Sequence, residues 1–180
     1  MILAIDPGNE RSGWALCLHS SGIEKQGRQQ IFRIEDCGID ENFKVGDRIR
    51  RSSVACKIVI EGMDHTGMPV GKEVFETLMW IGRFDNEAGQ MHRSVDIIQR
   101  REVRLNMCGS SWAKDANIKQ AVIDRLGPVG TVKAPGPMHI VRRNGGKHIW
   151  QALGLAITYL ETLKSGNGKS ASQIRNLDTA

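Results

Sequence analysis

The chain opens with an apolar run that ends on a carboxylate, and this stretch limits the fold more than any other. Residues 1–5 are all apolar, which is typical of a fully buried strand, and Asp6 follows directly, before the turn-forming Pro7 and Gly8. A carboxylate at the tip of a buried strand loses hydration and needs a cation or hydrogen-bond donors to be stable there. The stretch therefore indicates either a turn-capping aspartate or a ligand for a cation.

A second apolar strand ends in the same way. Residues 56–60 are apolar apart from Lys57, and Glu61 and Gly62 follow them. Open α/β sheets carry their ligand sites at the carboxyl ends of strands. If the two strands are neighbours in one sheet, Asp6 and Glu61 converge on a common site.

The remaining periodicities predict a single α/β domain over residues 1–164, followed by a flexible polar tail over residues 165–180. Apolar runs predict further strands at 12–19, 29–36 and 94–99. Helical periodicity predicts helices at 40–54, 70–83, 110–126 and 147–163. In the second of these helices Val74, Leu78 and Ile81 share one face, with Phe75 and Met79 beside it, and we expect these residues in the core or in a subunit interface. Residues 100–104 are basic and are expected on the surface.

Composition places few limits on function. The net charge of +5 suits a polyanionic partner, although a generic basic surface would have the same charge. No apolar run is long enough to span a membrane and no signal peptide opens the chain, so we expect a cytoplasmic protein of a bacterium or a phage-infected host, without membrane attachment. The four cysteines lack metal-ligand spacing, which favours buried thiols.

The last predicted helix carries two polar residues on one face. His148 and Gln151 are three positions apart and therefore share a helix face, which continues through the apolar Leu155 and Tyr159. A helix with this pattern presents its first turn to a site and buries the remainder. Beside two strand-tip carboxylates, His148 is better explained as a ligand than as a structural histidine.

Three segments together resemble the RuvC family of Holliday-junction resolvases, in a phage or prophage branch: residues 4–8, 60–61 and 147–156. The resemblance implies an α/β, ribonuclease-H-like fold with a mixed central sheet flanked by helices. It also implies a homodimer that cuts Holliday junctions or other branched DNA, such as forks or flaps. Two Mg²⁺ ions, for which Mn²⁺ is expected to substitute, would be held by Asp6, Glu61 and His148, with no nucleotide cofactor.

Gln151 is the fourth catalytic position implied by the resemblance, and here the chain departs from the family pattern, which has aspartate. An amide oxygen can contact a metal ion but brings no charge. At about 4 Å and an effective dielectric constant near 20, one lost charge–charge contact costs on the order of 4 kcal/mol before compensation. The glutamine therefore predicts a weakened metal site and impaired cleavage.

The resemblance also implies a junction-probing loop directly after the catalytic glutamate. In this chain the loop is residues 63–68, where Met63 or His65 would insert between bases. The family often has an aromatic residue in this loop, and its lack here favours broader branched-DNA cleavage over strict junction opening. Basic residues in the second half of the chain are candidates for phosphate contacts: Lys114, Lys119, Arg142, Arg143 and Lys147.

Three functions follow from these patterns. The first is a Mg²⁺-dependent endonuclease of branched DNA, which hydrolyses phosphodiesters with two metal ions. The second is a branched-DNA-binding protein with weak or absent catalysis, which the uncharged Gln151 favours. The third is an actin-like nucleotide-binding protein, since an aspartate and a glycine after the first strand also suit phosphate binding. A chain of 180 residues is too short for the two domains that the third function requires.

Overall fold

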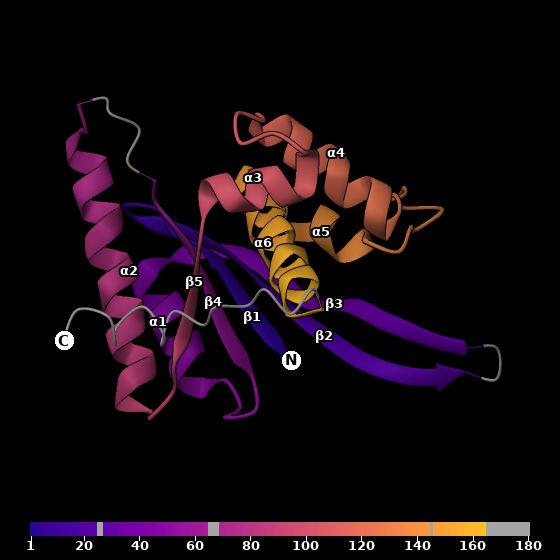
Figure 1. Cartoon of the computed structure of the whole chain (residues 1–180), viewed down its shortest axis with the longest axis horizontal. Coiled ribbons are helices and arrows are strands. Elements are labelled where there is room, and N and C mark those ends of the chain that lie inside the picture. The colour runs from indigo at the N-terminus through magenta and orange to yellow at the C-terminus, as the bar shows by residue number, and fades with distance from the viewer. Residues whose placement is uncertain (25–26, 65–68, 145, 165–180) are drawn as a thin grey trace.

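The computed structural model describes residues 1–24, 27–64, 69–144 and 146–164, with backbone only for 20–24, 27–31, 142–144 and 164. The five strands form one sheet in the order β3-β2-β1-β4-β5 (Figure 1). They are β1 (Ile2–Asp6), β2 (Arg11–Glu24), β3 (Gly27–Glu41), β4 (Lys57–Gly62) and β5 (Val95–Gln99). β1 is antiparallel to β2 and parallel to β4, and β4 is parallel to β5. The predicted mixed sheet flanked by helices is confirmed.

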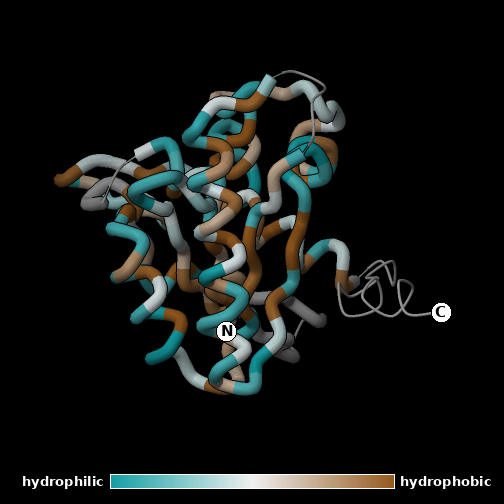
Figure 2. Tube along the Cα trace, turned by 90° about the vertical axis from the view of Figure 1, so that its left-hand side faces the viewer, coloured by the Kyte–Doolittle hydropathy of each residue, from teal (hydrophilic) through white to brown (hydrophobic). Residues whose placement is uncertain are grey.

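Helices cover both faces of the sheet. One face packs against α1 (Asn42–Arg51) and α2 (Lys72–Gln90). The other packs against α3 (Arg100–Cys108), α4 (Asp115–Leu126), α5 (His139–Asn144) and α6 (Lys147–Lys164). In Figure 2 the central strands are mostly brown, whereas the outer helices alternate between brown and teal. This pattern is expected when strands are buried on both faces and helices on only one.

The alternation of side chains along β1 and β4 decides where their terminal carboxylates point. Ile2 and Ala4 belong to the core beneath α6, whereas Leu3 and Ile5 belong to the core beneath α1 and α2. Since side chains alternate along a strand, Asp6 continues the row of Ile2 and Ala4. Glu61 continues the row of Val59 in the same way. Both acids therefore project toward the face that α3 and α6 cover.

Helix α6 is the central element of that face. Residues 149–160 are all buried, and the helix packs on β1, β2 and α4. Its predicted extent and burial are confirmed, and so is the strand predicted at 94–99. Cys17, Cys37 and Cys56 are buried as thiols, and burial raises the pKa of the Cys17 thiol. Within the described ranges, no helix has the length and apolar character needed to cross a membrane.

The hairpin of β2 and β3 is longer than predicted, and the helix predicted at 40–54 is too long. Residues up to Glu41 pair with β2, where Arg11 lies opposite Glu41, so the helix begins only at Asn42. Among the apolar residues within the predicted range 40–54, Val45 and Ile49 are buried, but Phe43 and Val54 are exposed. Strand pairing overrides helical periodicity here because pairing with β2 satisfies the backbone hydrogen-bonding groups of residues 37–41.

In the second predicted helix, a position in the core is confirmed for Ile81 but not for Leu78. Helix α2 continues to Gln90 and buries Thr77, Ile81, Phe84 and Ala88, whereas Leu78 is 46% exposed. The prediction stopped near residue 83 and therefore missed Phe84 and Ala88. With these two residues included, the buried face of the helix runs through Phe84 and Ala88 and leaves Leu78 outside it. A helix turns the face that is apolar along its whole length toward the sheet.

The second half of the chain holds more helix than predicted. Residues 100–108 form α3, and only residues 100–104 of it were predicted, as a basic surface segment. Helix α4 begins at Asp115 rather than at residue 110. The short helix α5 lies in a glycine- and proline-rich stretch for which no helix was predicted. Val103 and Met107 are the buried residues of α3, and two buried apolar positions are too few for a clear periodicity. The predicted tail at 165–180 lies outside the described residues.

Gly13 sets how closely β2 approaches the start of α6. It lies opposite Asp6 in the sheet, and a methyl group on it would be 2.5 Å from the Cβ and carbonyl oxygen of His148. We expect Gly13→Ala to lower the free energy of unfolding by about 1–3 kcal/mol, because the backbone of α6 would have to move.

The measurement is urea unfolding, with Gly82→Ala in α2 as the control. A methyl group at Gly82 meets no atom within 4 Å, so this change should stabilise the helix by about 0.5–1 kcal/mol. Equal stability of Gly13→Ala and the native chain would contradict the close approach.

Candidate active site

Asp6 and Glu61 end two neighbouring parallel strands at the same level. In the pairing of β1 with β4, Ile5 lies opposite Ile60, so the next residue of each strand is an acid. Asp6 is fully buried and Glu61 is 3% exposed. Two buried carboxylates at one edge of a sheet repel each other and lose hydration, so they require positive charge nearby.

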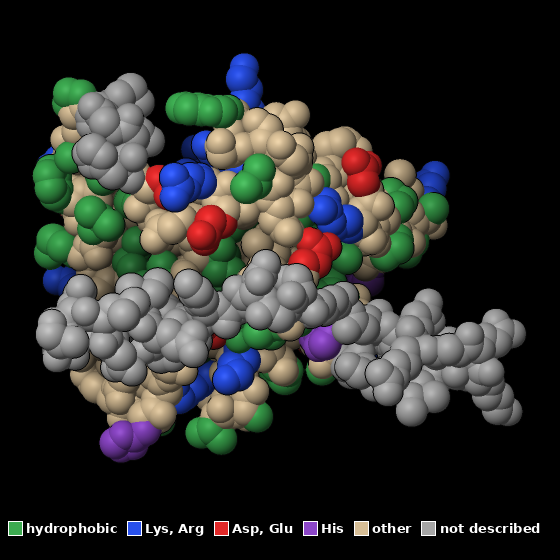
Figure 3. All heavy atoms as spheres, viewed as in Figure 1, with side chains coloured by type: hydrophobic (Ala, Val, Ile, Leu, Met, Phe, Trp, Pro, Cys, Tyr) green, Lys and Arg blue, Asp and Glu red, His purple; other side chains and the backbone are tan. Residues whose placement is uncertain are grey.

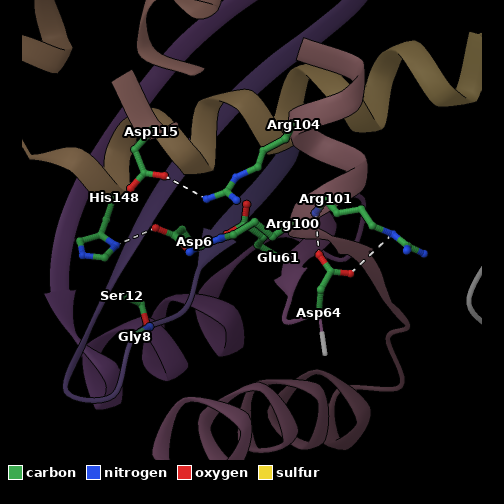
Figure 4. A network of polar contacts seen from close by, with 10 residues as sticks. All are labelled: Asp6, Gly8, Ser12, Glu61, Asp64, Arg100, Arg101, Arg104, Asp115 and His148. Atoms are coloured by element: carbon green, nitrogen blue, oxygen red, sulfur yellow. Dashed lines mark hydrogen bonds and ion pairs between the residues drawn. The ribbon is translucent and has the colours of Figure 1, made fainter. Parts of the chain in front are cut away.

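Arg100 supplies positive charge between the two acids (Figure 4). Its Nη2 lies 3.1 Å from Asp6 Oδ1 and 2.7 Å from Glu61 Oε2. Its Nε also donates to Glu61 Oε2 at 2.8 Å. One guanidinium thus contacts both carboxylates, so the two strand tips converge.

His148 reaches the same site from the first turn of α6. Its Nδ1 lies 2.7 Å from Asp6 Oδ2, and its side chain is 33% exposed. The close approach of Gly13 to the His148 backbone allows this contact. Asp6 is therefore held on one oxygen by Arg100 and on the other by His148.

Gln151 lies one turn further along α6 and is 2% exposed. Among the described residues, neither its Nε2 nor its Oε1 has a hydrogen-bond partner, and the same holds for Glu61 Oε1. Each buried polar group without a partner costs about 1–3 kcal/mol. Such groups gather where a site binds something that the protein itself does not provide.

Burial dominates the electrostatics of this cluster. Burial, followed by the neighbouring Asp6 charge, raises the pKa of Glu61 to about 8, although Arg100 opposes the shift. Burial lowers the pKa of Arg100, but the Glu61 and Asp6 carboxylates outweigh it and the pKa is raised overall. The guanidinium therefore keeps its charge, and two carboxylates share one internal cation.

The donor atoms of the site fit a divalent cation. Carboxylate and amide oxygens with an imidazole nitrogen are ligands that Mg²⁺ and Mn²⁺ accept, and the unpartnered Glu61 Oε1 and Gln151 Oε1 are buried acceptors of this kind. In the part of the chain that the structure describes, no cluster of three or more His, Cys, Asp or Glu side chains is arranged to hold a metal ion. Arg100 instead holds Asp6 and Glu61.

The structure describes the side chains of only some of the predicted DNA-contacting residues. Met63 directly follows β4 and is 37% exposed, and His65 lies outside the described residues, as do the side chains of Arg142 and Arg143. Lys114, Lys119 and Lys147 are all exposed. Lys119 and Lys147 line one open groove with Asp115 and Trp150, and the Lys119 ammonium lies 5.3 Å from the Trp150 ring centroid.

Sequence reasoning missed Arg100 and its surroundings. Residue 100 comes directly after β5, which is parallel to β4 and ends at the same edge of the sheet. The rule that identified Asp6 and Glu61 therefore also applied to Arg100. Arg104 and Asp115 were missed as well, and they pair at 3.4 Å above His148 in Figure 4.

We expect Gln151→Met to raise the free energy of unfolding of the metal-free protein by about 1 kcal/mol. Methionine has a similar shape and removes two buried polar atoms that lack partners. Urea unfolding in a chelating buffer measures the change.

Thr158→Val on the same helix is the control. The Thr158 hydroxyl accepts a hydrogen bond from Asn106 Nδ2 at 3.3 Å, so its loss should not stabilise the protein. A lower stability of Gln151→Met than of the native chain would show that the amide is already satisfied.

No family model matches the sequence, and no curated protein matches it. Among solved structures, Thermus thermophilus RuvC aligns with a TM-score of 0.64 at 15% identity, covering 92% of this chain and 96% of that one. RuvC of the same organism in complex with a Holliday junction substrate gives the same score and identity, covering 92% and 95%.

Fowlpox virus resolvase, solved with Holliday junction DNA, aligns with a TM-score of 0.57 at 11% identity, covering 90% of this chain and 99% of that one. The phage or prophage branch stays a prediction, because these structures do not distinguish it. The likeness covers nearly the whole length of each protein and agrees with the sheet order and the helices described above. The chain therefore has a RuvC-like, ribonuclease-H-like fold, as its three sequence segments predicted.

Proposed function

We propose that this protein is a divalent-metal-dependent endonuclease that cuts Holliday junctions or other branched DNA. One observation carries the proposal: the buried strand-tip acids Asp6 and Glu61 meet His148 at one edge of the sheet. The fold supports it, because two of the similar structures are resolvases in complex with Holliday junctions.

Asp6, Glu61 and His148 would hold the metal, and Gln151 Oε1 would add a neutral ligand. Mg²⁺ or Mn²⁺ at this site would supply an activated water and positive charge for the phosphate. Asp6 orients the His148 ring through the contact at 2.7 Å. In an alternative role, His148 would not bind the metal but would orient and deprotonate the nucleophilic water.

Exposed lysines at the start of α4 and α6 are candidates for contacts with a polyanion. Figure 3 shows blue Lys and Arg side chains interspersed with red acids over the face formed by α3 and α4. Lys114, Lys119 and Lys147 are exposed and would contact phosphates, with Arg142 and Arg143 as further candidates. Met63 and His65, which follow the catalytic strand β4, would probe the bases.

A second function is a branched-DNA-binding protein with little or no cleavage. Two observations favour it. Gln151 brings no charge to the site, and Arg100 contacts the two carboxylates that would bind metal. Binding and cleavage must therefore be measured separately.

We expect the native chain to cut a labelled four-way junction in the presence of Mg²⁺, and Asp6→Asn to cut it at least about 100-fold more slowly. Gel-shift binding by Asp6→Asn should be unchanged or slightly tighter, since one negative charge near phosphate is removed. Asp47→Asn on α1, across the sheet from the site, is the matched control and should cut normally.

Binding without cleavage by the native chain would support the second function. In that case Gln151→Asp distinguishes the neutral glutamine from Arg100 as the cause of the missing cleavage. Restored cleavage would identify the glutamine as the limiting residue. Failure of the native chain to bind branched DNA in preference to a linear duplex would contradict both functions.

We also propose that the protein acts as a homodimer through α2. Phe75 and Met79 are each 57% exposed and Leu78 is 46% exposed, although all three are large and apolar. Apolar patches of this kind mark interaction surfaces. A two-fold dimer would also match a junction that requires two symmetric cuts.

Sedimentation should give a dimer for the native chain at micromolar concentration and a monomer for the double variant Phe75→Glu with Met79→Glu. The buried charges would oppose association. Glu73→Gln, on an exposed position of the same helix, should remain dimeric. A native chain that sediments as a monomer would refute this arrangement.

A further inference from the structure

Arg100 lies where a cation bridging Asp6 and Glu61 would lie. A single nitrogen, Nη2, is within 3.1 Å of one carboxylate and 2.7 Å of the other. The Nε contact to Glu61 at 2.8 Å makes the guanidinium a two-point partner for that acid. This arrangement is more specific than a surface ion pair, because Asp6 and Glu61 are almost completely buried.

The site is divided at Asp6 into two halves. Oδ1 of Asp6 faces Arg100, and Oδ2 faces His148 at 2.7 Å. Among the described residues, the buried Oε1 of Gln151, on the same helix as His148, lacks a hydrogen-bond partner. The half with Glu61 Oε2 thus already contains a cation, although Glu61 Oε1 also lacks a partner among the described residues. The helix that carries His148 provides a further unpartnered oxygen, that of Gln151.

The base of Arg100 is held in place by its neighbours. The backbone nitrogen of Arg101 donates to Asp64 Oδ2 at 2.7 Å, and the backbone nitrogen of Gln99 donates to Glu102 Oε2 at 3.2 Å. These contacts fix the junction of β5 and α3 on both sides of residue 100. Arg100 is therefore directed at the acids by the fold, although 36% of its side chain remains exposed and can face a phosphate.

The charges of the site agree with one divalent ion better than with two. Asp6 and Glu61 contribute at most two negative charges, and Arg100 offsets one of them. A second divalent ion between these acids would lie against a guanidinium of like charge in a poorly hydrated site. Gln151 adds no negative charge that could offset this repulsion.

We propose that the active centre binds a single divalent ion, on the side of Asp6 Oδ2, His148 and Gln151, and that Arg100 supplies the second positive charge between Asp6 and Glu61. The proposal rests on the metal-dependent function above and replaces the expectation of two ions per site. In this arrangement the guanidinium stabilises negative charge on the phosphate, as a planar donor suited to phosphate oxygens.

The test counts Mn²⁺ ions on the full chain without DNA. Isothermal titration calorimetry should give one Mn²⁺ per native chain, and electron paramagnetic resonance should show the six-line spectrum of an isolated ion. Arg100→Gln frees the space between the two acids, so it should bind two Mn²⁺ per chain and give a spin-coupled spectrum. Neither measurement depends on cleavage.

Three further variants identify the cause of the single ion. Arg100→Lys keeps the charge and should still bind one Mn²⁺. Arg101→Gln, which changes the neighbouring arginine that contacts Asp64, should behave as the native chain does. Gln151→Asp restores a carboxylate but leaves Arg100 in place, so it should bind one Mn²⁺ about tenfold more tightly, within the range for changes around a metal ligand.

Each contrary result has a distinct meaning. Two ions on the native chain, or two on Gln151→Asp, would overturn the role of Arg100 and leave the metal-dependent function intact. One ion on a folded Arg100→Gln variant, as judged by circular dichroism, would also overturn it. No Mn²⁺ on the native chain and on every variant would instead refute the proposed metal site. If Arg100→Gln does not fold, the counts for the native chain, Arg100→Lys and Gln151→Asp decide the question.

Discussion

The contact between one guanidinium and two buried carboxylates is the interaction on which this site depends. Asp6 and Glu61 end strands that are buried on both faces, so their charges cannot be screened by water. Arg100 compensates them from a third strand end, and His148 takes the remaining oxygen of Asp6. The sheet order places β1, β4 and β5 side by side, and without that order the three groups could not meet.

Helix α6 covers one side of the site. It lies against the sheet over its whole buried length, and at its first turn only a glycine at position 13 leaves room for the backbone of His148. The tight packing carries Gln151 into the interior, where its amide lacks a partner among the described residues. A core selected for stability alone would hold an apolar side chain there, so this polar atom is best explained by function.

The fold and the chemistry of the site are separate properties. At 15% identity the backbone still follows that of a RuvC structure, because alternation and helix packing tolerate many sequences. The charge of the site does not follow from the fold. Here a neutral glutamine and an internal arginine together shift the site toward positive charge. The number of ions that it binds must therefore be derived from these side chains.

The sequence by itself determined the buried strands, the two acids at their tips and the long final helix, because continuous apolar runs and a period of 3.6 are local signals. It could not determine that Arg100 lies between Asp6 and Glu61, since the position of a long side chain depends on which strand is the neighbour. Helix α3 and the rotation of α2, which buries Phe84 rather than Leu78, were likewise decided by tertiary packing. A helix turns toward whichever partner buries most of its apolar surface, and that partner lies far away in the sequence.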